Sequence, residues 1–161
     1  MGLVLRPLER GLLAEATSIW NAIIDQGDSF PDDTPLTEQA AWDMFARQTE
    51  TVCALDNGTV VGVYILHPNN FGRCGHIANA SFAVAPGQRG KGTGKALVED
   101  CLERAAKHGF KGLQFNAVVA SNTTAIALYL KLGFRILGMI DNGYRLKDGT
   151  YRDTVVFLKS W

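Results

Sequence analysis

The spacing of apolar residues along the chain predicts an alternation of strands and helices. Apolar positions recur at helical spacing over residues 8–26, over the segment that Thr37 caps, over residues 94–108 and over residues 122–132. Runs rich in β-branched and aromatic residues predict strands at residues 4–7, 51–55, 60–66, 77–85, 113–119, 134–140 and 154–158. Strands on both sides of helices indicate an α/β fold in which about four helices cover a mixed central sheet of about six to seven strands.

One hairpin is predicted by its turn residues. Asn57-Gly58 separates two β-rich runs, and an Asn-Gly pair readily adopts the positive φ angles that a two-residue hairpin turn requires. The strands at residues 51–55 and 60–66 are therefore expected to be antiparallel neighbours.

Length and composition then narrow the class of protein. The chain has 161 residues, 47% of them hydrophobic and 20% charged, which predicts one globular domain over residues 1–161. Sixteen basic residues balance sixteen acidic ones, so the electrostatic footprint of a nucleic-acid-binding protein is missing. No apolar run is long enough to span a membrane.

The cysteines and the N-terminus point to a reducing, cytoplasmic setting. Cys53, Cys74 and Cys101 are odd in number and widely spaced, which predicts neither a disulfide framework nor a metal site. The N-terminal segment meets Arg6 before a long apolar run develops, so it does not read as a signal peptide.

A glycine-rich turn between a strand and a helix carries the first chemical signal. Glycines let a backbone approach a ligand closely, and the N–H groups at a helix N-terminus attract phosphate. The turn, from Val84 to Leu97, also holds the basic residues Arg89, Lys91 and Lys95. It matches neither the P-loop pattern nor the dinucleotide-binding pattern G-x-G-x-x-G. The hypothesis is a diphosphate cradle, and the alternative is a tight connection without a ligand.

Two motifs in this chain resemble those of the GNAT superfamily of N-acetyltransferases. Residues 84–94 fit the pattern V-x-P-x-x-R-G-x-G-x-G, and residues 122–134 fit N-x-x-A-x-x-L-Y-x-K-x-G-F. The resemblance implies a single-domain GNAT fold and an enzyme that transfers an acetyl group from acetyl-CoA directly to an amine in a ternary complex, without a metal.

The resemblance also implies roles for individual residues. Tyr129 would give a proton to the departing thiolate, although an aromatic residue in a helix often serves packing alone. Backbone N–H groups at the splayed end of the central strand would stabilise the oxyanion. The residues implied in cofactor binding are Phe82, Ala83, Val84, Arg89, Gly90, Lys91, Gly92, Thr93, Gly94, Lys95, Asn122 and Tyr129. Asn122 is equally suited to a plain helix N-cap.

Two asparagines within apolar strands are candidate acceptor-side residues. Asn79 and Asn116 interrupt runs where an amide is disfavoured unless it finds hydrogen-bond partners, so each has a structural and a catalytic interpretation. Their surroundings resemble the fungal proline-analogue acetyltransferases, and the early region resembles the phosphinothricin acetyltransferase group. Both resemblances imply a small amino acid or its analogue as acceptor. A general base is not evident, with His76 or a water molecule as the candidates.

Two other functions remain open at this point. One is acetylation of a protein or peptide, and the other is a non-catalytic module that senses acyl-CoA. Members of the family often pair, so the resemblance also implies a homodimer.

Overall fold

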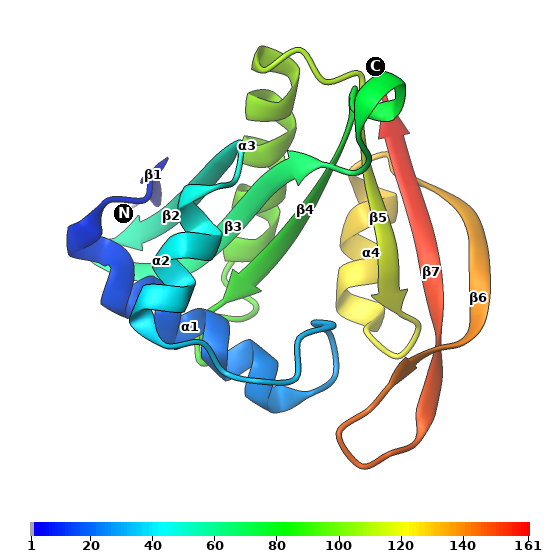
Figure 1. Ribbon diagram of the computed structural model, residues 1–161, viewed down its shortest axis with the longest axis horizontal. Helices are drawn as coiled ribbons and strands as arrows, with labels where there is room; N and C mark the ends of the chain where they lie inside the picture. Colours follow the sequence, from blue (N-terminus) through cyan, green and yellow to red (C-terminus); the bar gives the residue numbers. More distant parts are fainter. Residues whose placement is uncertain (1) are drawn as a thin grey trace.

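The computed structural model describes residues 2–161, in which seven strands form one mixed sheet (Figure 1). The strands are β1 (Val4–Pro7), β2 (Glu50–Asp56), β3 (Thr59–Pro68), β4 (Ile77–Val84), β5 (Gly112–Val119), β6 (Arg135–Arg145) and β7 (Tyr151–Ser160). Their order across the sheet is β1-β2-β3-β4-β5-β7-β6. All neighbours are antiparallel except β4 and β5, which are parallel.

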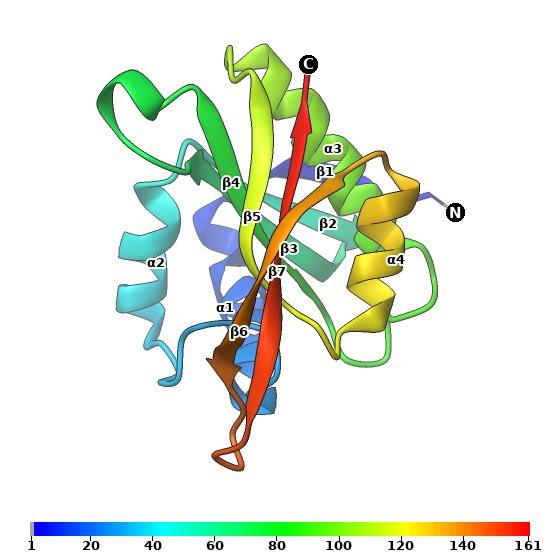
Figure 2. The same ribbon diagram turned by 90° about the vertical axis from the view of Figure 1, so that its right-hand side faces the viewer.

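Four helices cover the two faces of the sheet. They are α1 (Leu13–Gln26), α2 (Glu38–Ala46), α3 (Thr93–Lys107) and α4 (Thr123–Lys131), and short 3₁₀ turns occupy Arg10–Leu12 and Gly72–Cys74. Figure 2 shows α1 and α2 on one side of the sheet and α3 and α4 on the other. The predicted α/β architecture is therefore confirmed. None of the helices in residues 2–161 is long and apolar enough to cross a membrane.

Each face of the sheet buries its own apolar core. On the α1 and α2 face, Trp20 packs between Phe30 and Phe45 at ring distances of 4.6 and 5.5 Å. On the α3 and α4 face, Phe115 stacks on Phe134 with ring centroids 4.9 Å apart. Burial on both faces explains why β2 and β3 read as nearly continuous apolar runs.

Several local predictions hold, and others needed correction. Asn57 and Gly58 have φ angles of 50° and 82° and close the expected β2–β3 hairpin. The first helix begins at Leu13 rather than at Leu8, because the preceding residues form a 3₁₀ turn. Strands β6 and β7 are longer than predicted, reaching Arg145 and starting at Tyr151. The polar residues that obscured the extension of β6 lie on the edge strand, where Asn142 N–H donates to Asp153 at 2.9 Å.

The sheet opens between β4 and β5. Only two residue pairs join these strands, Ile77 with Gly112 and Ala78 with Leu113. Beyond these pairs the strands diverge, which leaves a gap that widens toward the C-terminal ends of both strands (Figure 1).

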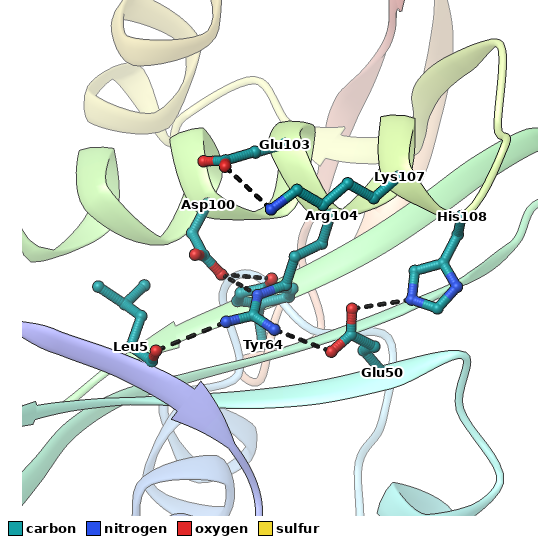
Figure 3. A network of polar contacts seen from close by, with 8 residues as sticks. All are labelled: Leu5, Glu50, Tyr64, Asp100, Glu103, Arg104, Lys107 and His108. Carbon is teal, nitrogen blue, oxygen red and sulfur yellow. Dashed lines mark hydrogen bonds and ion pairs between the residues drawn. The ribbon is translucent and has the colours of Figure 1, made fainter.

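A polar network fixes α3 to the closed half of the sheet (Figure 3). The Tyr64 hydroxyl, whose pKa is raised by burial, donates to Asp100 at 2.7 Å. Arg104 donates to Asp100 at 2.7 Å and to Glu50 at 3.0 Å, and His108 lies 2.8 Å from the other Glu50 oxygen. These contacts tie α3 to β2 and β3, and so they fix the helix whose N-terminus borders the gap.

Candidate active site

The glycine-rich turn lies where β4 ends and α3 begins. Gly90 and Gly92 have φ angles of 78° and 84°, which favour glycine, and a Cβ atom on either would meet no protein atom within 4 Å. Gly92 is the N-cap of α3 and offers no side chain to the first N–H groups of the helix. The turn therefore exposes backbone donors at the positive end of a 15-residue helix, as an anionic ligand requires.

The basic residues of the turn surround these donors from the solvent side. Arg89, Lys91 and Lys95 are exposed. Arg89 donates to the Gln26 side chain at 2.9 Å, so its guanidinium is held against the end of α1 while its other donors remain available. The phosphate-cradle prediction for this turn fits the geometry.

Backbone groups of β4 face the gap in alternation. Asn69 N–H donates to the Ile77 carbonyl and Ala85 N–H to the Val61 carbonyl, so odd-numbered residues of β4 exchange backbone bonds with β3. The N–H groups of Phe82 and Val84 therefore point toward β5, whereas the backbone of Ala83 faces β3. Of the three residues proposed as oxyanion donors, the geometry favours Phe82 and Val84.

Helix α4 carries Tyr129 against the same part of the sheet. The Tyr129 ring lies 4.5 Å from that of Phe115 and 5.5 Å from that of Phe157, centroid to centroid. Burial raises the pKa of Tyr129, so its hydroxyl remains protonated near neutral pH. Within residues 2–161 this hydroxyl has no hydrogen-bond partner, and it is free to donate to a ligand. Asn122 accepts from Ala125 N–H at 3.3 Å, which confirms it as the N-cap of α4.

Asn79 and Asn116 meet beside the gap through a third asparagine that the sequence analysis missed. Asn69, which directly follows β3, accepts from the Asn79 amide at 3.0 Å and from the Asn116 amide at 2.7 Å. The two predicted residues are thus brought together although β4 and β5 have separated at this level. A cluster of Asn69, Asn79 and Asn116, hereafter the amide cluster, results.

The orientation of each amide follows from one backbone N–H group. The Ala80 N–H, on the β5 side of β4, donates to Asn79 Oδ1 at 2.7 Å. Asn79 must then turn its Nδ2 toward Asn69, whose Oδ1 also receives Asn116 Nδ2. Asn116 Oδ1 in turn accepts from Gln114 Nε2 at 3.0 Å. Most acceptor positions are thereby used, and the groups left for a ligand are mainly N–H donors.

A pocket of about 480 Å³ lies on the α1 and α2 face of the sheet. Ile65 and Ser81 line it and lie opposite each other in the β3–β4 ladder. The next pair on that face of the ladder is His67 and Asn79. The other lining residues include the apolar Trp20, Phe30, Leu36 and Met44 and the charged Asp32, Asp43 and Arg47. The edge of the pocket at Ser81 is therefore one same-face position of β4 away from Asn79.

Two histidines lie near β4. His76 is exposed in the turn before β4, at the closed end of the gap, where its carbonyl accepts from Lys111 N–H at 2.7 Å. His67, which the sequence analysis gave no role, lies opposite Asn79, and its Nδ1 is 2.8 Å from the Pro68 carbonyl. That contact requires a proton on Nδ1 and leaves Nε2 as the nitrogen that can accept a proton. The strand alternation of Ile65 and His67 was the available sequence signal.

Comparisons with known proteins agree with this arrangement. The family model described as "Acetyltransferase (GNAT) family" matches residues 16–134. N-acetyltransferase aca1 of Schizosaccharomyces pombe is 35% identical over 153 residues, covering 84% of this chain and 73% of that protein.

Two solved structures share the whole architecture. A GCN5-related N-acetyltransferase from Kribbella flavida superposes with a TM-score of 0.92 at 32% identity, covering 99% of this chain and 98% of that one. A phosphinothricin acetyltransferase from Sinorhizobium meliloti, in complex with acetyl-CoA, superposes with a TM-score of 0.91 at 26% identity, covering 99% and 89%.

Proposed function

Because this chain belongs to the GNAT acetyltransferase family and is an acetyl-CoA-dependent N-acetyltransferase, we propose that it acetylates the amine of a small amino acid or amino acid analogue. The observation that carries the proposal is the amide cluster, which offers N–H donors beside the gap between β4 and β5. In an amino acid the carboxylate is only one carbon away from the amine. An acceptor whose amine reaches the gap therefore brings its carboxylate to these donors.

The pocket lined by Ile65 and Ser81 also suits a small amino acid or its analogue as the acceptor. Its apolar wall, formed by residues such as Trp20, Phe30 and Met44, suits an amino acid side chain. Asp32, Asp43 and Arg47 place both signs of charge around the pocket, which suits a zwitterion better than a polyamine. A long peptide would require a groove that continues beyond this pocket.

The glycine-rich turn before α3 and the gap between β4 and β5 suit acetyl-CoA, the acetyl donor. The α3 N-terminus with Arg89, Lys91 and Lys95 would hold the diphosphate, and the gap would receive the pantetheine arm. Acetyl-CoA supplies the acetyl group as an activated thioester. The N–H groups of Phe82 and Val84 would donate to its carbonyl oxygen as negative charge develops there. Tyr129 would donate its proton to the leaving sulfur.

A panel of matched acceptors tests this proposal. Thiol release from acetyl-CoA is measured with free amino acids, proline analogues and phosphinothricin, and with the amide and decarboxylated form of each active amino acid. We expect the carboxylate to raise kcat/KM by about tenfold or more, because a site built to donate hydrogen bonds rejects analogues that lack the acceptor. Faster turnover of peptides would contradict the proposal and favour a protein acetyltransferase.

Replacing Arg89 with glutamate is expected to raise the Kd of acetyl-CoA by about tenfold. The change reverses a charge beside the diphosphate and removes charge-assisted hydrogen bonds. Isothermal titration calorimetry measures the affinity. Lys111→Glu is the matched control, because Lys111 is exposed but lies after the far end of α3. Equal losses in both variants would show that only overall charge matters.

We infer that His67, rather than His76, takes the proton from the attacking amine. His67→Gln is expected to lower kcat by about tenfold, since it removes a base on the acceptor face, whereas His76→Gln should change little. Steady-state kinetics of the two variants at one pH provides the comparison. An equal response would return the role to water.

The outer edge of the sheet supports a homodimer. Strand β6 lies at the edge of the sheet beside β7 (Figure 1). Its residues Ile136, Met139 and Ile140 are each about half exposed. An exposed strand edge with apolar side chains is a surface on which another chain can pair. Sedimentation velocity at micromolar concentration tests the proposal, and a single monomeric species would contradict it. The three free cysteines, two of them buried, suit a reducing compartment such as the cytoplasm.

A further inference from the structure

Asn69 lies outside both sequence motifs, yet its side chain joins two strands across the open part of the sheet. It follows β3 in the chain, and its Oδ1 atom receives one amide from β4 and one from β5. The backbone bonds between β4 and β5 end at Ala78 and Leu113, before the level of these amides. Asn69 therefore supplies a link between the strands where the ladder supplies none.

The two amides depend on Asn69 to different degrees. Asn79 has a second anchor, because its Oδ1 accepts from the Ala80 N–H. Asn116 is exposed, and its remaining hydrogen bond is with the side chain of Gln114, two residues away on the same strand. Without Asn69 the Asn116 side chain keeps no hydrogen bond outside β5 within residues 2–161, and its amide can rotate. The relative orientation of the two amides across the gap would then be lost.

The loop that carries Asn69 does not need this side chain to keep its shape. The Asn69 backbone N–H donates to the Ile77 carbonyl at 2.8 Å, and Cys74 N–H donates to the Phe71 carbonyl at 3.1 Å. Asn70 accepts from Phe71 N–H at 2.8 Å. The backbone bonds hold the loop without the Asn69 side chain, whose carbonyl accepts from the amides of the two strands instead.

We propose that Asn69 is a positioning residue for acetyl transfer, which holds the amides of Asn79 and Asn116 in one orientation and at one separation across the gap. The inference rests on the proposed function in that these amides contact the acceptor. With both amides fixed, each keeps one N–H that the amide cluster does not use, so the pair can offer two donors to the acceptor. Preorganised donors of this kind bind a ligand without first being ordered.

Kinetics of Asn69→Ala, with Asn70→Ala as its matched control, gives the first test. We expect Asn69→Ala to lower kcat/KM for the acceptor by about tenfold while leaving the Kd of acetyl-CoA and the melting temperature nearly unchanged. Asn70→Ala removes a neighbouring asparagine that contacts only its own loop, so it should retain wild-type kinetics. The acceptor is whichever compound gives most turnover in the panel.

A double-mutant comparison separates positioning from a structural role. In a chain that already carries Asn79→Ala and Asn116→Ala, Asn69 has nothing left to position, so adding Asn69→Ala should cost no further activity. A further loss of the same factor in that background would overturn the proposal. The result does not depend on the chemical class of the acceptor, so it stands apart from the success or failure of the proposed function.

Side-chain amide resonances provide a readout that needs no turnover. In ¹⁵N-correlated spectra, Asn69→Ala should shift the NH₂ signals of both Asn79 and Asn116, whereas Asn69→Asp, which keeps an oxygen acceptor, should largely preserve them. Unshifted signals in Asn69→Ala would overturn the proposal even if an amino acid proves to be the acceptor. Conversely, if the panel shows a preference for peptides, the shifts can still confirm that Asn69 positions the amides of Asn79 and Asn116.

Discussion

Tyr129→Phe is expected to lower kcat by about 10²- to 10⁴-fold, the usual contribution of a positioned general acid. The substitution removes the Tyr129 hydroxyl and keeps the ring that packs on Phe115 and Phe157. The Kd of acetyl-CoA and the melting temperature should therefore change little. Steady-state kinetics and calorimetry on the same preparation measure both quantities.

The pKa of Tyr129 gives this prediction a pH dependence with a definite sign. Burial raises the pKa of the phenol above its ordinary value, so the proton donor stays loaded through neutral and mildly alkaline pH. The wild-type kcat should show no alkaline decline from this group below about pH 10. Tyr151→Phe is the control, since Tyr151 is exposed on β7. Full activity of Tyr129→Phe would remove the residue from the mechanism.

Arg104→Ala is expected to lower the free energy of unfolding by about 2 to 3 kcal/mol, since it leaves Asp100 and Glu50 without their shared partner. Asp100 would keep its hydrogen bond from the fully buried Tyr64 but would lose the Arg104 charge that balances its own (Figure 3). For a chain of this length the melting temperature should fall by about 5 to 10 °C. Urea denaturation and a thermal scan measure the effect.

A second ion pair on the same helix provides the matched control. Lys107 pairs with Glu103 at 3.2 Å, but both side chains are about two-thirds exposed. Exposed pairs of this kind contribute less than about 1 kcal/mol, so Lys107→Ala should scarcely change stability. If both variants lost the same stability, the network around Arg104 would be no more than surface electrostatics.

Local sequence signals account for much of the fold. The Asn57-Gly58 turn, the Thr37 cap of α2 and the Asn122 cap of α4 each depend on residues close in sequence, and all three are present. The far end of β6 was missed because Asp141, Asn142 and Gly143 interrupt the apolar pattern there. Asn142 adopts a φ of 52° beside a break in register, an irregularity that an edge strand tolerates.

In the candidate site, too, some residues follow from local sequence signals and others do not. The glycine turn and Tyr129 belong to contiguous motifs, so the sequence predicts them directly. Asn69 stands in a polar loop where an asparagine is ordinary, and its partner Asn116 is 47 residues away. Asn69 and Asn116 meet because of the register of β3 on β4 and the opening between β4 and β5, neither of which a local sequence pattern shows. A third asparagine directly after a strand, 10 residues before Asn79, was the signal that could have raised the question.

The main chain and the side chains of β4 have different roles. Its even-numbered residues turn backbone N–H groups toward the gap, while the side chains of Asn79 and Ser81 lie on the α1 and α2 face, where Ser81 lines the pocket. Almost any residue supplies an N–H group, so mutation at the side-chain positions can alter the acceptor without dismantling the handling of acetyl-CoA. During evolution, substitutions at the side-chain positions of β4 can therefore change the preferred substrate while the acetyl-transfer chemistry is retained.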